Sequence, residues 1–294
     1  MSSNNIKVHF AGSHSNSLDV LSAIYAAGGR YFLLTAYPFI ESKKSDEISP
    51  ESSLYEFMLP WKHVIVDSGL FTLMFGAKKT APKTKEFIRE WMHRLCKFIS
   101  VNKIDASVVE VDCQKIISPE FAWDLRKEMR QLLPRQEIIN VFHLEDGKDG
   151  FERLCEWSDY IAISVPELRI AQPKKYRNTT NALTRLARQI KPDIKIHLLG
   201  CTEQSLLKTN RFCTSADSSS WSSSMRYGTI DKRHVSAMTD EAIEKANDKI
   251  DDVYRMIGCP IQQRSERRRA YDAAAFYSAL KCHKDYTRWA GRQD

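Results

Sequence analysis

Three aspartates, Asp67, Asp112 and Asp217, each stand at the end of a short apolar run of the sequence. Runs of this kind, rich in β-branched residues, are typical of buried strands, so a carboxylate there costs desolvation unless it is paired or used. Two carboxylates with separate tasks, one a nucleophile and one an acid or base, suit chemistry at the anomeric carbon of a sugar. We predict that the three side chains meet in one active site; the alternative is that single aspartates only cap loops.

The elements that must position these residues alternate between short apolar runs and longer helical patterns, which predicts a parallel sheet wrapped by helices. We expect strands at 6–12, 31–37, 63–69, 106–112, 138–144, 160–166, 195–201 and 211–217. Helical patterns cover 16–27, 83–101, 118–132, 149–157, 173–190, 202–209, 239–257 and 265–282. Eight such units favour an α/β fold, a (β/α)8 TIM barrel with a C-terminal helical extension. The barrel would span residues 1–235, and residues 236–294 would form basic helices packed on it.

Active sites of such barrels lie at the carboxyl ends of the strands, where the connecting loops converge. The rim residues predicted here include several acids but no histidine-rich set, which disfavours a metallohydrolase. No lysine stands at a strand end, and Lys195 begins its strand, which argues against Schiff-base chemistry. We therefore expect neither a metal nor a cofactor. The polar segment within 38–62 is interpreted as a mobile loop over the barrel mouth or, equally, as a surface insertion.

Composition narrows the class further. The formal net charge is +7, and a basic cluster at Arg264, Arg267, Arg268 and Arg269 suggests either a polyanionic partner or a solvated helix face. The seven cysteines are scattered and odd in number, which predicts free thiols in a reducing compartment. The sequence has neither a membrane-length apolar run nor the apolar stretch of a signal peptide. We therefore expect a cytoplasmic protein without a membrane partner.

Several motifs resemble those of the guanine transglycosylases, which exchange guanine for a 7-deazaguanine in tRNA. VDSGLFT (66–72) is similar to their DSGGFQ motif, and VEVDCQ (109–114) to the base-binding aspartate segment that follows. ISVPEL (163–168) stands where the family has a glycine-rich loop that touches the base, and HLLGCTE (197–203) resembles its HxLG-type strand. SADSSSW (215–221) occupies the place of the nucleophile segment. The order of these motifs agrees over roughly residues 6–228.

The resemblance implies a role for each aspartate. Asp217 would attack C1′ of the sugar, Asp67 would act as general acid and base, and Asp112 would read the purine edge. It further implies base contacts from a second group of residues, which comprises Ser68, Gly69, Gln114, Val165 and Gly200. Because the base must leave the stack, the resemblance implies a flipped-out or single-stranded substrate.

Contacts around the target nucleotide are predicted from residue type and position. An aromatic such as Phe71, Trp221 or Tyr227 could stack on the base, although core packing is the alternative for each. Arg226 and Lys232, together with the basic cluster, would contact the nucleic-acid backbone.

Departures from the family pattern bear on the polymer. DSGLFT lacks the second glycine and the glutamine, and neither the zinc-binding motif nor the tRNA-binding domain of the tRNA enzymes is present. The short length and the SADSSSW–RYG ending look most like phage-type DNA 7-deazaguanine transglycosylases, which implies DNA and a 7-deazaguanine such as preQ0 as substrates. If a phage encodes the protein, the resemblance implies the host cytoplasm as its compartment. A tRNA-specific relative, a catalytically inactive nucleic-acid-binding barrel and a nucleoside or glycoside hydrolase remain the alternatives.

Overall fold

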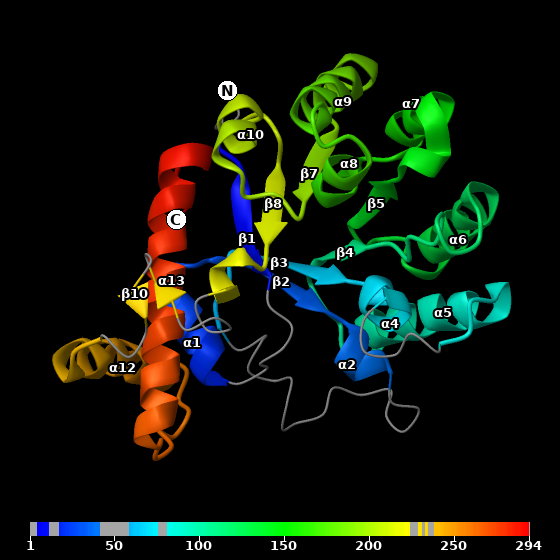
Figure 1. The fold of residues 1–294 in the computed structure, drawn as a ribbon. Coiled ribbons are helices and arrows are strands. Elements are labelled where there is room, and N and C mark those ends of the chain that lie inside the picture. The colour runs from blue at the N-terminus through cyan, green and yellow to red at the C-terminus, as the bar shows by residue number, and fades with distance from the viewer. Residues whose placement is uncertain are drawn as a thin grey trace.

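The computed structural model describes residues 5–11, 18–41, 59–75, 81–223, 229–230, 233–234 and 238–293. Eight parallel strands close into a barrel in which each strand pairs with its neighbours in chain order, and β1 pairs with β8 (Figure 1). The strands are β1 (Lys7–Ala11), β2 (Tyr31–Thr35), β3 (His63–Asp67), β4 (Ser107–Val109), β5 (Ile138–Phe142), β6 (Tyr160–Ser164), β7 (Lys195–Leu199) and β8 (Ser215–Ser218). The predicted (β/α)8 barrel is confirmed, with every strand inside or overlapping its expected range.

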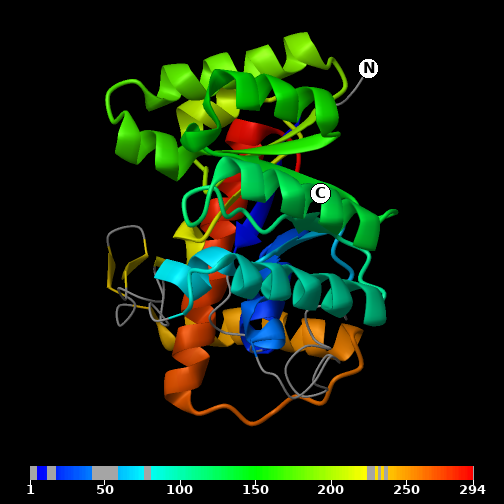
Figure 2. The same ribbon diagram turned by 90° about the vertical axis from the view of Figure 1, so that its right-hand side faces the viewer.

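Helices connect the strands and cover the outside of the barrel (Figures 1 and 2). They are α1 (Leu18–Ala26), α2 (Tyr37–Ile40), α4 (Leu70–Phe75), α5 (Lys85–Val101), α6 (Pro119–Leu132), α7 (Gly147–Trp157), α8 (Val165–Ala171), α9 (Tyr176–Ile190), α10 (Gln204–Thr209), α12 (Asp240–Met256) and α13 (Glu266–Ala290). Short 3-10 turns η1 (Leu144–Asp146) and η2 (Ser220–Ser222) and a hairpin of β9 (Thr229–Ile230) and β10 (Arg233–His234) complete the described elements. All eight predicted helices are present, whereas α2, α4, α8, the 3-10 turns and the hairpin were not predicted.

Local sequence explains where the covering helices begin. The side chain of Thr84 accepts a hydrogen bond from the backbone N–H of Phe87 at the start of α5, and Ser118 does the same for Phe121 at the start of α6. The apolar side of α5 carries Trp91, whose indole donates to the carbonyl oxygen of Ser68 at 3.0 Å. This bond ties the helix to the turn that follows β3. The expected loop 38–62 begins with α2, and its residues 42–58 lie outside the described part of the chain.

The C-terminal helices are part of the barrel wall. α13 packs against α10, α1 and α12, so it fills the position of the helix that follows the eighth strand (Figure 1). Its end is fixed to β1, because the backbone N–H of Ile6 donates to the carbonyl oxygen of Ala290 at 3.0 Å. The side-chain amide of Gln293 bridges Ile6 and Val8 with bonds of 2.7 and 2.9 Å. Both C-terminal helices contact α1, and α13 also contacts β1.

The inside of the barrel differs between its two sides. Ile65, Val109, Ile139 and Ala162 form part of a buried apolar cluster around β3 to β6. Around β7, β8 and β1, buried polar side chains such as His9 and His197 take their place. Buried polar groups need hydrogen-bond partners. The chain of bonds that satisfies His197 leads directly to Asp217.

Candidate active site

The structure brings Asp67, Asp112 and Asp217 together at the carboxyl ends of their strands. Asp67 is the last residue of β3, Asp217 lies within β8, and Asp112 follows β4 by three residues. Asp67 is close enough to both other aspartates that their negative charges raise its pKa. The grouping predicted from the strand ends is therefore observed. The three carboxyl groups therefore surround one end of the barrel, its mouth.

The carboxylate of Asp217 is held in a fixed orientation. Its Oδ1 accepts hydrogen bonds from the backbone N–H of Gly200 at 2.7 Å and from His197 Nε2 at 3.1 Å. Asp217 is 7% exposed, so these donors replace water around Oδ1. No described residue donates a hydrogen bond to its other oxygen, Oδ2.

His197 is itself oriented by a buried series of hydroxyl groups. Its Nδ1 lies 2.5 Å from Ser215 Oγ, and Ser215 Oγ lies 2.5 Å from the hydroxyl of Tyr160. With the Nε2 proton directed to Asp217, Nδ1 accepts from Ser215, and Ser215 accepts from Tyr160. The histidine was not predicted as a site residue. Two sequence signals point to it: His197 is the first residue of the HLLGCTE segment (197–203), and it lies two residues before the end of β7.

Asp67 has the surroundings of a group that exchanges protons. Burial raises its pKa to about 7, the charges of Asp112 and Asp217 act in the same direction, and a hydrogen bond from the Gly69 N–H opposes them. That bond, from Gly69 N to Asp67 Oδ2, is 3.0 Å long. A carboxyl with a pKa near 7 is roughly half protonated at neutral pH, so it can both give and accept a proton.

Asp112 belongs to a row of alternating charges. His143 donates to Asp112 Oδ2 at 3.0 Å through Nε2 and to Glu167 Oε2 at 2.8 Å through Nδ1. Lys115 pairs with Glu167 Oε1 at 2.8 Å. Burial alone would lower the pKa of His143, but its bonds to Asp112 and Glu167 raise it to about 10. The histidine is therefore an imidazolium that fixes one oxygen of Asp112 and leaves Oδ1 directed elsewhere.

The same row could be mistaken for a metal centre. Ligand atoms of His143, Glu145 and Glu167 lie within 4.8 Å of one another. A metal ion needs an unprotonated ring nitrogen, whereas both nitrogens of His143 serve carboxylates and its pKa is about 10. Burial would raise the pKa of Glu167, but its bonds to His143 and Lys115 lower it to about 2. The donor set fits an ion-pair network better than a metal.

Two of the glycines predicted to touch the base hold the aspartates. Gly69 has φ +74°, and a Cβ there would lie 2.7 Å from Tyr37 Cβ. Gly200 has φ +64°, and a Cβ there would lie 2.6 Å from Pro166 Cγ. Both positions therefore need glycine for conformation and for space. Each glycine then donates its N–H to a carboxylate, Gly69 to Asp67 and Gly200 to Asp217.

The remaining predicted base contacts lie in the frame of the site. Ser68 is buried, and its hydroxyl accepts from the N–H of Leu70 at 3.4 Å. The Gln114 amide donates to the carbonyl of Val141 at 2.9 Å, and its Oε1 has no hydrogen-bond partner among the described residues. Val165 is a buried core residue at the start of α8, so only its backbone could reach a base. Their predicted contacts with the base stay predictions.

The three aromatic candidates lie in different places. Trp221 is a core residue whose indole donates to the carbonyl of Ala11 at 2.7 Å, which is the packing alternative given above. Phe71 is 72% exposed on α4, directly after the turn that holds Asp67. Tyr227 lies outside the described residues. Phe71 is therefore the aromatic placed to meet a ligand among the described candidates.

Part of the predicted basic surface serves the fold. Arg264 is mostly buried and pairs with Asp251 and, at 3.6 Å, with Asp19, while Arg268 pairs with Asp19 at 2.9 Å. These bonds join α1 to the C-terminal helices. We therefore leave Arg264 and Arg268 out of the backbone-binding surface. From the other predicted positions, Arg267 is exposed and Arg269 partly exposed, and Arg226 and Lys232 lie outside the described residues.

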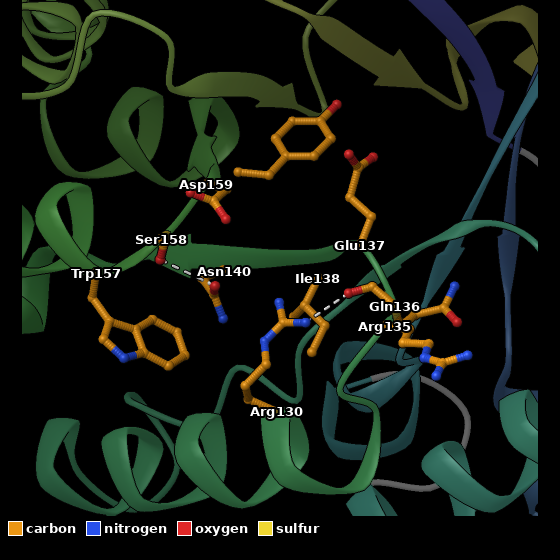
Figure 3. Close-up of a pocket in the computed structure, with 10 residues that line it drawn as sticks. Arg130, Arg135, Gln136, Glu137, Ile138, Asn140, Trp157, Ser158 and Asp159 are labelled. Carbon is orange, nitrogen blue, oxygen red and sulfur yellow. Dashed lines mark hydrogen bonds between the residues drawn. The ribbon is translucent and has the colours of Figure 1, made fainter.

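A pocket of about 490 Å³ opens at the other end of the barrel, near the starts of β5 and β6 (Figure 3). Arg130, Glu137 and Trp157 are among its lining residues. The guanidinium of Arg130 donates to the carbonyl of Gln136 at 2.7 Å, and Glu137 is paired with Lys195. The pocket is thus separate from the three aspartates, and Arg130, Glu137 and Asp159 within it are already partnered.

No protein-family model matches this chain, and no curated protein sequence matches it. The transglycosylase resemblance therefore stays a prediction, which rests on the motifs. All seven cysteines are free, as predicted. In the part of the chain that the structure describes, no helix combines the length and apolar character needed to cross a bilayer. The fold is that of a TIM barrel, a fold common among enzymes.

Proposed function

We propose that the protein is a DNA-guanine transglycosylase that exchanges guanine in DNA for a 7-deazaguanine base such as preQ0. The observation that carries the proposal is a pair of carboxyl groups with different surroundings in one barrel mouth. Asp217 is fixed by Gly200 and His197, whereas the pKa of Asp67 is raised to about 7. An oriented carboxylate beside a protonatable carboxyl is the division of labour that glycosyl exchange requires.

In the first step of the proposed reaction, Asp217 Oδ2 attacks C1′ of the deoxyribose. The bond between C1′ and the base nitrogen breaks, its electron pair stays with guanine, and Asp67 supplies the proton that neutralises the departing base. The product is an ester between Asp217 and the sugar. The hydrogen bonds from Gly200 and His197 to Oδ1 keep Asp217 from rotating away as the ester forms.

In the second step the incoming base loses a proton to Asp67, which the first step left as a carboxylate. The base nitrogen attacks C1′, the ester bond breaks, and Asp217 returns to its starting form. Atoms and protons therefore balance over the cycle without a cofactor. Asp67 must change its protonation state twice, which a group with a pKa near 7 does at little free-energy cost.

Base selection is assigned to Asp112. Its Oδ2 bonds His143, and its Oδ1 can accept from the N1–H and exocyclic amine edge that guanine and 7-deazaguanines share. The imidazolium of His143 holds Oδ2 of Asp112 in place, so that Oδ1 is the oxygen assigned to the base. The choice of DNA over tRNA rests on the sequence, namely on the altered DSGLFT motif and the missing zinc motif.

The direct test is to incubate the protein with DNA that carries labelled guanine and with preQ0. We expect release of label, incorporation of the deazaguanine and a denaturation-resistant protein–DNA adduct, all lost in Asp217→Asn. Exchange into tRNA alone would replace DNA by RNA as substrate. Release of free base without an acceptor would identify a hydrolase. Unchanged exchange by Asp217→Ala would remove Asp217 as nucleophile, and no turnover on either polymer would leave a binding barrel.

A further inference from the structure

The short helix α8 stands directly against the residue that holds Asp217. Pro166, in its first turn, is so close to Gly200 that a Cβ on the glycine would lie 2.6 Å from Pro166 Cγ. α8 also packs on β7 and on α9 (Figure 1). The end of α8 and its connection to α9, residues 169–175, therefore lie beside the barrel mouth. We refer to residues 169–175 as the α8–α9 segment.

The α8–α9 segment presents unbalanced positive charge. Arg169, Lys174 and Lys175 are exposed, and their side chains form no ion pair or hydrogen bond with another described residue. Arg169 lies on α8, the helix whose Pro166 packs against Gly200, and Gly200 donates its N–H to Asp217. The positive charge therefore extends from the helix that supports the proposed nucleophile.

Carboxylates beside the segment are already neutralised. Glu203, on the connection after β7, pairs with Arg177 and accepts from the hydroxyl of Tyr176 at 2.6 Å. Glu167 is neutralised by His143 and Lys115. Glu145, which is exposed after β5, has a carboxylate oxygen within 4.8 Å of ligand atoms of Glu167 and His143. The surface therefore suits a polyanion that passes over the β6–β7 side of the mouth.

An apolar side chain stands among these cations. Ile170 is 83% exposed, more than any other described large apolar residue. Burying such a side chain is favourable, and apolar wedges such as isoleucine are used to open stacked bases. A protein that flips a base out of a duplex must break its stacking, and an apolar side chain beside the pocket can fill the space that the base leaves.

We propose that the α8–α9 segment is the docking surface for the nucleic-acid strand that carries the target base. Arg169, Lys174 and Lys175 contact its phosphates, and Ile170 occupies the stack next to the departed base. The proposal rests on the proposed function. Arg264 and Arg268 form ion pairs with Asp19. The phosphate contacts are therefore assigned to the α8–α9 segment instead of these two residues.

The test compares the full-length protein with a triple variant, Arg169→Ala, Lys174→Ala and Lys175→Ala. A matched control removes three exposed cations far from the mouth, with Lys127→Ala, Arg135→Ala and Arg185→Ala. Binding to a fluorescein-labelled oligodeoxynucleotide is measured by anisotropy between about 50 and 200 mM salt. Losing three phosphate contacts should weaken binding by about tenfold or more and reduce the slope of log K against log salt by about 2 to 3. The control should keep the wild-type slope.

The outcomes separate the surface from the reaction. A triple variant with the wild-type affinity and slope overturns the surface, even if both proteins exchange bases. A loss of slope in the triple variant alone supports the surface, even if the wild type exchanges nothing and the proposed function fails. Wild-type protein that does not bind the oligonucleotide overturns the surface outright. Equal melting temperatures of the variants exclude unfolding as the cause.

Ile170 gives a separate readout. Ile170→Ser should lower exchange on duplex DNA more than on a single strand, because a wedge matters only where a stack must be opened. Leu132→Ser, an exposed apolar residue at the end of α6, is the control. Equal loss on both substrates, or no loss on either, removes the wedge from the proposal.

Discussion

At the amino ends of the barrel strands Glu137 and Asp159 lie beside lysines, whereas at the carboxyl ends Asp67 lies beside two other acids. Glu137 accepts from Lys195 and Ser107, and Asp159 pairs with Lys191 at 2.6 Å. Burial would raise the pKa of Glu137, but these hydrogen bonds lower it below its usual range. Among the described residues no such cation pairs with Asp67, and burial with two neighbouring acids raises its pKa to about 7. Environment rather than residue type decides which acid can move protons.

The largest effect should come from Asp217→Asn, which keeps shape and removes the nucleophile. We expect exchange to fall by about 10⁴-fold or more and the covalent adduct to disappear, because no ester can form. Adduct trapping and label release measure both. Glu137→Gln, at the opposite end of the barrel, is the matched control and should retain wild-type exchange. If Glu137→Gln lost as much exchange activity as Asp217→Asn, the two ends of the barrel would not differ in function.

Asp67→Asn should lower exchange by about 10²- to 10⁴-fold, because the proton donor and acceptor is lost. The same substitution should raise the free energy of unfolding, although it lowers the exchange rate. The folded-state pKa of Asp67 is about 7 against 3.8 for the free group, so its stabilising contribution is present below pH 3.8 and is lost as pH rises through 7. Because asparagine does not ionise, Asp67→Asn does not lose this stability as the pH rises. Urea unfolding at pH 6 and 8.5 should show its advantage over wild type growing with pH; a pH-independent difference would contradict the raised pKa.

His197 tests whether Asp217 must be oriented. His197→Leu removes the Nε2 donor, and we expect kcat to fall about 10- to 100-fold with little change in KM. His197→Gln can still offer an N–H to Oδ1 and should recover part of the rate. A purely structural role would instead give two variants that differ in melting temperature but have the same kcat.

The smallest effect is a shift in the pH profile. Because Asp67 must be protonated to release guanine, kcat/KM should fall as pH rises above about 7. Asp112→Asn removes a negative neighbour, so the pKa of Asp67 falls and the decline moves to lower pH. The pH at which kcat/KM begins to decline is compared between wild type and Asp112→Asn. This pH does not depend on the absolute value of kcat/KM, which weaker base binding lowers in the variant. An unmoved limb would assign it to another group.

Local patterns were sufficient for the strands and for the position of Asp67 and Asp217, because alternation of apolar runs and helical periods is encoded over a few residues. They failed where a short helix follows a strand at once. The sixth strand was predicted to reach residue 166, but β6 ends at Ser164. Ser164 caps α8 by accepting a hydrogen bond from the N–H of Glu167 at 3.4 Å. The cap and the strand end share residues, so periodicity cannot separate them.

Partners distant in sequence were decided only by the tertiary structure. Glu110 and Asp112 lie two residues apart in VEVDCQ (109–114), yet Glu110 is buried in a two-pronged pair with Arg126, while Asp112 meets His143. Arg264 and Arg268 were predicted on a nucleic-acid surface, but Asp19, far away in the chain, takes up their charge. The sequence by itself determined which residues can ionise and which strand ends carry them. Only the packing of the barrel decided which charges are cancelled and which remain, because electrostatic pairing depends on distance in space and not along the chain.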